Sequence, residues 1–142
     1  MAVVTTIYPQ FKFDLLTKAV SVTVDVLKCA LFSASTYTST DTTYTTSGTE
    51  VASANGYTTG GVTVATVSTS TATTTPNLVK ISTASVWTAT GVGFTAVAAK
   101  IYDSTVANHP VAHIDFGGSQ TASGGGTFTI TYDATNGLFN LA

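Results

Sequence analysis

Three potential metal ligands lie close together in the last third of the chain. His109, His113 and Asp115 are separated by even numbers of positions, so on a β-strand they would share one face, with Ala112, Ile114 and Phe116 facing the core. Imidazole and carboxylate groups can bind Zn²⁺. An extended strand, however, holds His109 and His113 about 13 Å apart, too far for one ion unless the chain bends at Pro110. We therefore interpret them as a solvated strand face and predict no metal site.

The remaining candidates for catalysis are a single cysteine and a run of three glycines. Cys29 is surrounded by apolar residues in the sequence, and a buried cysteine usually acts as a small hydrophobic side chain. Gly124–Gly126 has no nearby lysine and no helical segment after it, so it indicates a hairpin turn rather than a phosphate-binding loop. The chain has no Gly-x-Ser-x-Gly, Ser-x-x-Lys or Walker motif. We therefore predict a protein that is not an enzyme, with no catalytic residues and no cofactor.

Two other residues have a chemical and a structural interpretation. Trp87 could stack on a sugar ring, but a single tryptophan within Ser85–Thr88 is more often part of the core. Asp103 follows Tyr102 directly, and aspartate commonly begins a turn, so we expect a strand to end there.

The elements that would position these residues are mainly strands. Alternating valines predict a strand over Val20–Phe32, and the alternation shifts by one residue after Val26, which predicts a bulge at Val26–Leu27. The only helix-like pattern covers Phe11–Ala19. Turn signals separate the other expected strands, which are Val62–Val67, Leu78–Ile81, Ser85–Thr88, Phe94–Tyr102, Val111–Phe116, Thr127–Tyr132 and Leu138–Leu141.

This spacing predicts an all-β fold, an antiparallel β-sandwich of immunoglobulin-like or jelly-roll character with at most one short helix near the N-terminus. Residues 11–142 would form a single domain. Ser33–Glu50 consists largely of serine, threonine, tyrosine and alanine, and indicates a long surface loop. The expected core residues are Val22, Val24, Leu31, Trp87, Phe94, Ile101, Ile114, Phe128, Ile130 and Tyr132.

The composition excludes several classes of function. Only 8% of the 142 residues are charged, against about 25% in ordinary globular proteins, whereas 31 are threonine and 13 are serine. Five lysines and no arginine give no cluster of cations for binding nucleic acid. The start of the chain lacks the features of a signal peptide, and the uncharged stretch 51–79 is interrupted by Gly56 and Pro76. We expect no membrane span and synthesis in a cytoplasm.

The first ten residues have two interpretations. They include the apolar residues Val3, Val4, Ile7 and Tyr8, carry no charge, and end at Pro9, which stops a regular strand. They could form an assembly arm that adds a strand to a neighbouring subunit, or the first edge strand of the chain's own domain. If they form an arm, removing residues 1–10 should leave the melting temperature nearly unchanged.

A series of short motifs resembles a group of small virion proteins of tailed bacteriophages. The motifs are the strand Lys28–Ser33, Glu50-Val51, the turn Asn55–Gly61 and several later segments, namely Ser85–Thr88, Phe94–Ala96, Lys100–Asp103, Ile114–Gly118 and Gly126–Asp133. The resemblance covers most of the chain from Phe11 onward, although the family strand near Ala98–Tyr102 often carries an arginine that is absent here. It implies a structural protein of the viral particle with no catalytic site.

The predicted function is therefore that of a non-enzymatic structural component of a tailed-phage virion, made in the host cytoplasm. We expect a capsid decoration (cement) protein on the head surface, and a neck, tail or fibre protein as the alternative within this class. A carbohydrate-binding β-module for host adhesion is the alternative from another class. The expected partners are other copies of this chain, in a homo-oligomer or a lattice, and the major capsid or head–neck proteins. We expect no nucleic acid and no membrane as partners.

Overall fold

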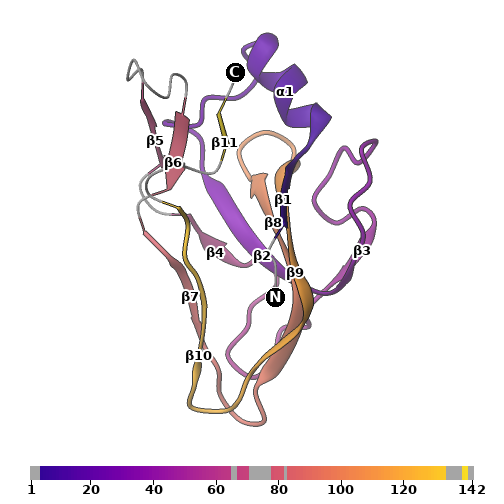
Figure 1. The fold of residues 1–142 in the computed structure, drawn as a ribbon, viewed down its shortest axis with the longest axis vertical. Helices are drawn as coiled ribbons and strands as arrows, with labels where there is room; N and C mark the ends of the chain where they lie inside the picture. The colour runs from indigo at the N-terminus through magenta and orange to yellow at the C-terminus, as the bar shows by residue number, and fades with distance from the viewer. Residues whose placement is uncertain (1–3, 65–66, 71–77, 82, 134–138, 141–142) are drawn as a thin grey trace.

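The computed structural model describes residues 4–64, 67–70, 78–81, 83–133 and 139–140. They contain one helix and eleven strands (Figure 1). In chain order these are β1 (Val4–Ile7), α1 (Pro9–Leu16), β2 (Leu27–Ser35), β3 (Gly48–Glu50), β4 (Val62–Thr63), β5 (Val67–Ser70), β6 (Leu78–Ile81), β7 (Ser85–Thr88), β8 (Phe94–Asp103), β9 (His109–Ala122), β10 (Thr127–Ile130) and β11 (Phe139–Asn140).

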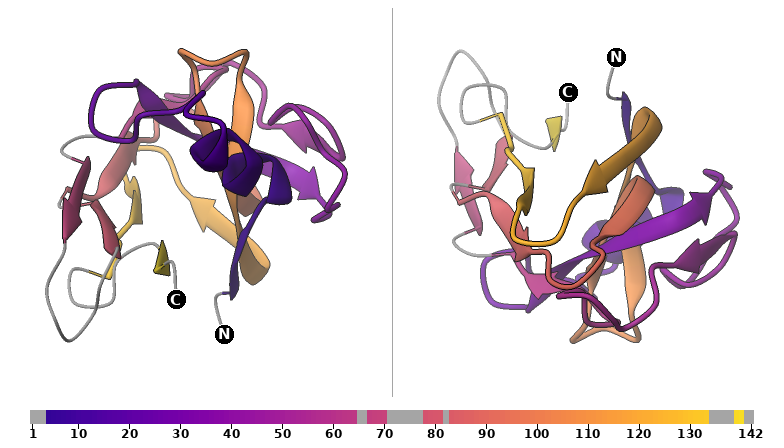
Figure 2. Two further views of the ribbon diagram at one scale, coloured as in Figure 1. Left: turned by 90° about the horizontal axis from the view of Figure 1, so that it is seen from above. Right: turned by 90° about the horizontal axis from the view of Figure 1, so that it is seen from below.

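The strands form three antiparallel sheets. The main sheet has the order β1-β9-β8-β2-β3, with β4 also paired to β2. The two smaller sheets are β10-β7 and β11-β6-β5, and they lie along one side of the main sheet (Figures 1 and 2). The predicted antiparallel β-sandwich with a single short helix is thus confirmed, and the sheets do not close into a barrel.

The helix lies near its predicted position but begins and ends earlier. We expected Phe11–Ala19, whereas α1 spans Pro9–Leu16. Pro9 fixes a backbone angle suited to the first turn of a helix and needs no hydrogen-bond acceptor there. Lys18 has a positive φ of 58°, which takes the chain out of the helical conformation just beyond Thr17.

The strand predicted over Val20–Phe32 is wrong in its first half. Residues 20–26 form a turn in which the carbonyl of Ser21 accepts hydrogen bonds from the N–H groups of Val24 and Asp25. The Asp25 carboxylate in turn accepts the N–H of Ser21, and such local bonds compete with a strand ladder. Val24 is consequently 78% exposed rather than in the core. The shift in the pattern at Val26–Leu27 marks the start of β2, not a bulge.

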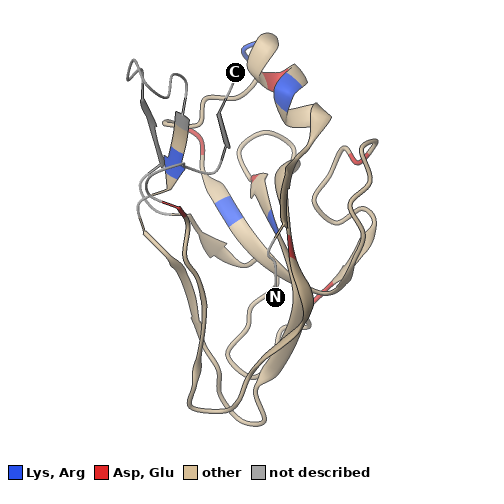
Figure 3. Ribbon diagram, viewed as in Figure 1, with Lys and Arg blue, Asp and Glu red and all other residues tan. Residues whose placement is uncertain are grey.

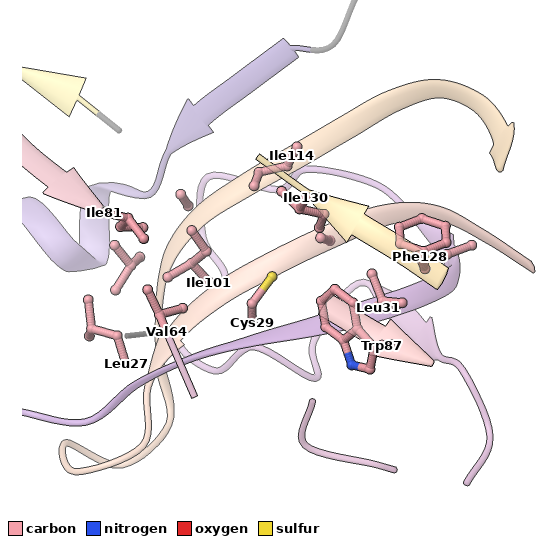
Figure 4. Close-up of a cluster of buried hydrophobic side chains, with 14 of the residues drawn as sticks. Leu27, Cys29, Leu31, Val64, Ile81, Trp87, Ile101, Ile114, Phe128 and Ile130 are labelled. Carbon is pink, nitrogen blue, oxygen red and sulfur yellow. The ribbon is translucent and has the colours of Figure 1, made fainter. Parts of the chain in front are cut away.

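The core between the sheets otherwise contains the predicted residues (Figure 4). Leu31 and Ile101 of the main sheet are completely buried, and Trp87 and Phe128 of the β10-β7 sheet belong to the same cluster. Tyr132 is partly buried against the same cluster. The remaining predicted residues are all buried, namely Val22, Phe94, Ile114 and Ile130. One apolar cluster therefore joins the main sheet to the smaller ones.

Two glycine runs that we expected to form turns between neighbouring strands have other roles. The strand predicted over Val111–Phe116 runs instead from His109 to Ala122, passing through Gly117 and Gly118 at a register irregularity. Gly124–Gly126 does not form a hairpin, because it connects β9 to β10 and β10 pairs with β7 in another sheet. The stretch predicted as Val62–Val67 is divided between β4 and β5, and part of it lies outside the described residues.

The other expected strands need little change. β6 and β7 have the predicted bounds, β8 is one residue longer, and β10 is shorter, ending at Ile130. β8 ends at Asp103 as predicted, and the Asp103 Oδ1 accepts hydrogen bonds from the N–H groups of Thr105 and Val106. In the segment Leu138–Leu141, the structure describes β11 and leaves both ends outside the described residues.

The predicted surface loop Ser33–Glu50 is largely a cover for the sheet. β2 continues to Ser35 and β3 begins at Gly48, which leaves residues 36–47 as the connecting segment. Within this segment Asp41 and Tyr44 are buried. Residues 36–47 therefore lie against the main sheet on the face opposite the apolar core, since Tyr44 clusters with Ala30, Phe32 and Tyr102.

Candidate functional site

The proposed assembly residues lie at one edge of the main sheet. β1 pairs antiparallel with β9 of the same chain, with Val4 opposite Asp115 and Ile7 opposite Ala112. Val4 is 56% exposed, Ile7 is partly buried against the apolar core, and Val3 lies outside the described residues. The chain thus takes the second of the two predicted conformations, an edge strand of its own domain.

Tyr8 anchors this edge strand. Its side chain is completely buried, its N–H donates to the Val111 carbonyl at 3.0 Å, and its ring centroid lies 5.1 Å from that of Tyr37. Burial, reinforced by the nearby Asp41 carboxylate, raises the pKa of the Tyr8 hydroxyl above its usual range. Because Tyr8 belongs to the folded domain, removal of the first residues is expected to destabilise the domain.

Next to Tyr8 lies a buried ion pair that the sequence did not predict. Lys100 in β8 is completely buried, and its Nζ lies 3.6 Å from the Asp41 carboxylate. The same Nζ donates to the Thr46 carbonyl and lies 5.0 Å from the centre of the Phe32 ring. Burial lowers the pKa of Lys100, and the Asp41 carboxylate opposes this shift. Lys100 therefore binds residues 36–47 to the sheet.

His113 extends this polar group onto β9. It is directly opposite Lys100 in the β8–β9 pairing, is buried, and has its Nε2 3.0 Å from the Ser35 hydroxyl. The Tyr37 ring makes an edge contact with its imidazole at 6.2 Å between centroids. Burial and the neighbouring Lys100 lower the pKa of His113, which favours the neutral imidazole.

His109 and His113 do not share a face, contrary to our expectation. His109 pairs with Asp103 and His113 with Lys100, and these two partners are three residues apart on β8, so they point to opposite faces. An extra residue in β9, between the partners of Ile101 and Tyr102, produces this change. His109 instead has its Nδ1 2.8 Å from the Asp14 carboxylate, which connects β9 to α1.

Because the two histidines lie on opposite faces, they are not placed together with Asp115 around one ion. Asp115 is exposed, whereas His113 is buried and His109 faces the helix. Across the described residues, no group of three histidine, cysteine, aspartate or glutamate side chains is arranged to hold a metal ion.

A second polar junction joins β3 to the turn over residues 55–61. Oε1 of Glu50 accepts hydrogen bonds from the Tyr57 hydroxyl and the Gly60 N–H, both at 2.6 Å. The Tyr57 hydroxyl also accepts the Leu31 N–H at 3.0 Å, and the Tyr102 hydroxyl donates to the Gly60 carbonyl at 2.8 Å. The carboxylate therefore fixes the turn against β2 and β8.

Glycine is required at the end of this turn for two reasons. Gly61 has a φ of 67°, in the left-handed region that favours glycine. A Cβ at this position would lie 1.8 Å from the Cys29 carbonyl oxygen, so the backbones of the turn and β2 can approach only without a side chain. We refer to Glu50, Tyr57, Gly60, Gly61 and Tyr102 as the Glu50 junction.

Cys29 and Trp87 are core residues, as their sequence contexts predicted. Burial raises the pKa of the Cys29 thiol to about 12, so the reactive thiolate is disfavoured. Ser85 and Tyr132 lie beside the thiol, and their hydroxyl oxygens are 2.7 Å apart. Trp87 is 4% exposed and packs edge-on against Phe128, so its ring is not available to stack on a sugar.

Sequence reasoning missed both polar groups for a common reason. Lys100 stands within the apolar run Ala96–Ile101 of β8, and this unusual position is the signal that could have identified it. Its partner Asp41 is 59 positions away in a segment without periodicity, so no local pattern connects the two. Figure 3 shows that the charged residues are scattered over the ribbon and do not gather on one element.

Comparisons with known proteins identify no relative of this chain. No protein-family model matches the sequence, and searches of curated proteins and of solved structures find no match. In the described part of the chain, the single helix is too short to cross a bilayer.

Proposed function

We propose that this chain is a non-enzymatic structural subunit of a tailed-phage virion, and specifically a capsid decoration protein on the head surface. The observation that carries the proposal is the Glu50 junction. The motifs that resemble the phage proteins include the strand Lys28–Ser33, Glu50-Val51 and the turn Asn55–Gly61, and the junction joins these three segments in space. Residues that define the resemblance thus act together to hold the fold.

The surface chemistry supports a role in assembly. β1 lies at the edge of the main sheet, where it pairs with β9 alone among the described strands, and its outer edge carries the uncharged sequence Val4–Ile7. Two hydroxyls also meet on the exposed part of β8 and β9, where Thr95 and Thr121 are hydrogen-bonded at 2.7 Å. Interfaces made from such surfaces should be apolar and rich in hydroxyls, so high salt should weaken them little.

The test is to locate the chain in purified particles. Cryo-electron microscopy of the intact virion should show its β-sandwich repeated on the outer surface of the head, in contact with the major capsid protein. Density at the neck, tail or fibre would overturn the decoration role while keeping a structural role in the virion. Absence of the chain from purified virions would overturn the whole proposal.

A second experiment addresses sugar binding. We expect no specific binding of the purified protein on a glycan array, because Trp87 lies in the core and its ring cannot reach a ligand. Strong and selective binding to one class of glycan would contradict the proposal and favour an adhesion module.

A further inference from the structure

Residues 36–47 cover one face of the main sheet through three buried ionisable side chains from three different elements. Asp41 belongs to the segment itself, Lys100 to β8 and His113 to β9, and they are 2%, 0% and 3% exposed. A polar cover of this kind is held by hydrogen bonds and ion pairs between particular side chains rather than by buried apolar area. Its stability therefore depends on the protonation state of those side chains.

The contacts of the segment lie at three points. At its base, the Thr36 N–H donates to the Ser47 carbonyl at 3.1 Å, which closes the loop. At its centre, Lys100 reaches Asp41 and the Thr46 carbonyl. At its far side, the Tyr44 N–H donates to the Asn108 carbonyl at 3.1 Å. Only the central point contains an ion pair.

Aromatic rings complete the cover. The Tyr44 ring stacks on Tyr102 with centroids 3.8 Å apart and planes 7° apart. Tyr37 lies between Tyr8 and His113, in contact with both rings. Lifting the segment would therefore expose the aromatic side of the sheet and also remove a ring that packs on Tyr8, the anchor of β1.

His113 is the group in this cluster whose usual pKa lies nearest to neutral pH. Lys100 faces it from β8, Asp41 from the covering segment, and Asp115 lies two residues along β9. The uncharged partners are the Ser35 hydroxyl from β2 and the Tyr37 ring, with Tyr8 stacked behind Tyr37. A proton on His113 would place a second buried cation beside Lys100. Among the described groups that face His113, Asp41 is the only buried carboxylate, so two cations would share one carboxylate.

We propose that residues 36–47 form an acid-released cover, in which protonation of His113 opens the segment and exposes the aromatic face of the main sheet. The segment is closed at neutral pH, when one buried cation meets one buried carboxylate. It opens in acid, when the additional charge can be hydrated only by admitting water beneath the segment.

The direction of the pH dependence follows from linkage. In the closed form, burial and Lys100 hold the pKa of His113 below its usual value of about 6.5, whereas in the open form the imidazole is hydrated and titrates near that value. The open form therefore binds the proton more tightly. Its population should rise by up to about tenfold for each pH unit below 6.5, until the pKa of the closed form is reached.

Amide hydrogen exchange of the full chain tests this directly. Between pH 7.5 and 5.5, after correction for intrinsic exchange rates, the Tyr44 amide should lose up to about tenfold of its protection. The Val51 amide, which donates to the Leu31 carbonyl outside the segment, should keep its protection and serves as the internal reference. Equal behaviour of the two amides would overturn the proposal.

A matched pair of variants identifies the histidine responsible. His113→Gln keeps a polar partner for Ser35 but cannot be protonated, so the pH dependence of the Tyr44 amide should disappear. His109→Gln changes the other histidine, which pairs with Asp14 on α1, and should leave that pH dependence intact. The opposite pattern would overturn the assignment to His113.

The proposal does not depend on whether His113→Gln folds. In the wild-type protein, the imidazole resonances of His113 can be titrated by nuclear magnetic resonance, and they should shift together with the loss of Tyr44 protection. If His113 titrates without any change at Tyr44, or if Tyr44 opens while His113 remains neutral, the proposal fails.

Discussion

The two faces of the main sheet are built from alternating residues of the same strands, yet they are held by different forces. On β2, Leu27, Cys29 and Leu31 point into the apolar core, and Ala30 and Phe32 point to the other face. The apolar face packs against the smaller sheets through one cluster of buried hydrophobic side chains. The other face meets residues 36–47 through an ion pair, a histidine and stacked tyrosines.

Both faces of the main sheet are buried, yet burial by itself does not indicate which interactions stabilise a face. A dry apolar interface depends on contact area and shape, and its stability should change little with pH. A buried polar interface depends on each partner being present, because a charge that loses its partner remains desolvated. The predictions below separate these two cases, beginning with the largest expected effect.

The largest effect should come from removing residues 1–8, which deletes β1 and Tyr8 together. The free energy of unfolding should fall by at least the 3–5 kcal/mol typical of losing one buried aromatic side chain, measured by urea denaturation. The physical reason is that Tyr8 is completely buried and connects the edge strand to Tyr37. An unchanged melting temperature would instead support a detachable assembly arm.

On the apolar face, Trp87→Ala should lower the free energy of unfolding by about 3–5 kcal/mol, because the cavity cannot be filled by its neighbours. The loss should be equal at pH 5.5 and pH 7.5, since no ionisable group with a pKa in that range contacts the ring among the described residues. A loss below about 1 kcal/mol would place Trp87 outside the core.

On the polar face, Asp41→Asn should lower the free energy of unfolding by about 3 kcal/mol, because Lys100 stays buried without a carboxylate. The double variant Lys100→Met with Asp41→Leu should recover most of this loss, since matched apolar side chains remove both charges. Asp115→Asn provides the control on β9, where the carboxylate is exposed, and should change stability by less than about 0.5 kcal/mol. A double variant as unstable as Asp41→Asn would argue against the ion pair.

The Glu50 junction should respond less strongly. Tyr57→Phe removes the hydroxyl that donates to Glu50 and accepts from the Leu31 N–H, and should cost about 1–2 kcal/mol. Tyr44→Phe removes a longer contact to Glu50, 3.3 Å between oxygens, and a contact with the Tyr102 hydroxyl, but no bond to a backbone N–H, and should cost less. Thermal unfolding of both variants gives the comparison, and the reverse order would contradict the geometry of the junction.

The smallest effect is expected at the outer surface of β7. Val86→Thr changes a side chain that is 47% exposed and next to Trp87 in sequence, and should alter the free energy of unfolding by less than about 0.5 kcal/mol. The difference between the losses caused by Val86→Thr and Trp87→Ala tests whether successive side chains of β7 point alternately to solvent and to the core. A loss approaching that of Trp87→Ala would mean that the outer side of β7 is also covered.

Much of the apolar face could be predicted from local pattern. β7 and β10 alternate cleanly, and Trp87, Phe128 and Ile130 are buried as their positions indicate. The pattern failed where local hydrogen bonds were stronger than alternation. Val20–Val26 alternates as well as any strand in the chain, yet the Ser21–Asp25 bonds form a turn and leave Val24 in water.

The polar groups could not be predicted, because their members come from distant parts of the chain. Asp41 lies in a segment of threonine and tyrosine that has no apolar periodicity, and nothing near it in sequence indicates burial. His109 and His113 have the spacing of a shared face, and a single extra residue in β9 places them on opposite ones. Register irregularities of this kind depend on the partner strand, so they leave no local signature.

The sequence by itself determined the class of the fold, most of the strands that face the apolar core and the glycine turn over Asn55–Gly61. It could do so because hydrophobic alternation and backbone freedom are local properties of neighbouring residues. Only the tertiary structure decided that β1 is an edge strand of its own sheet, that residues 36–47 cover the second face, and that Lys100 meets Asp41. These outcomes depend on which distant groups can satisfy one another's charges and hydrogen bonds once water is excluded, and that balance is set by the whole fold.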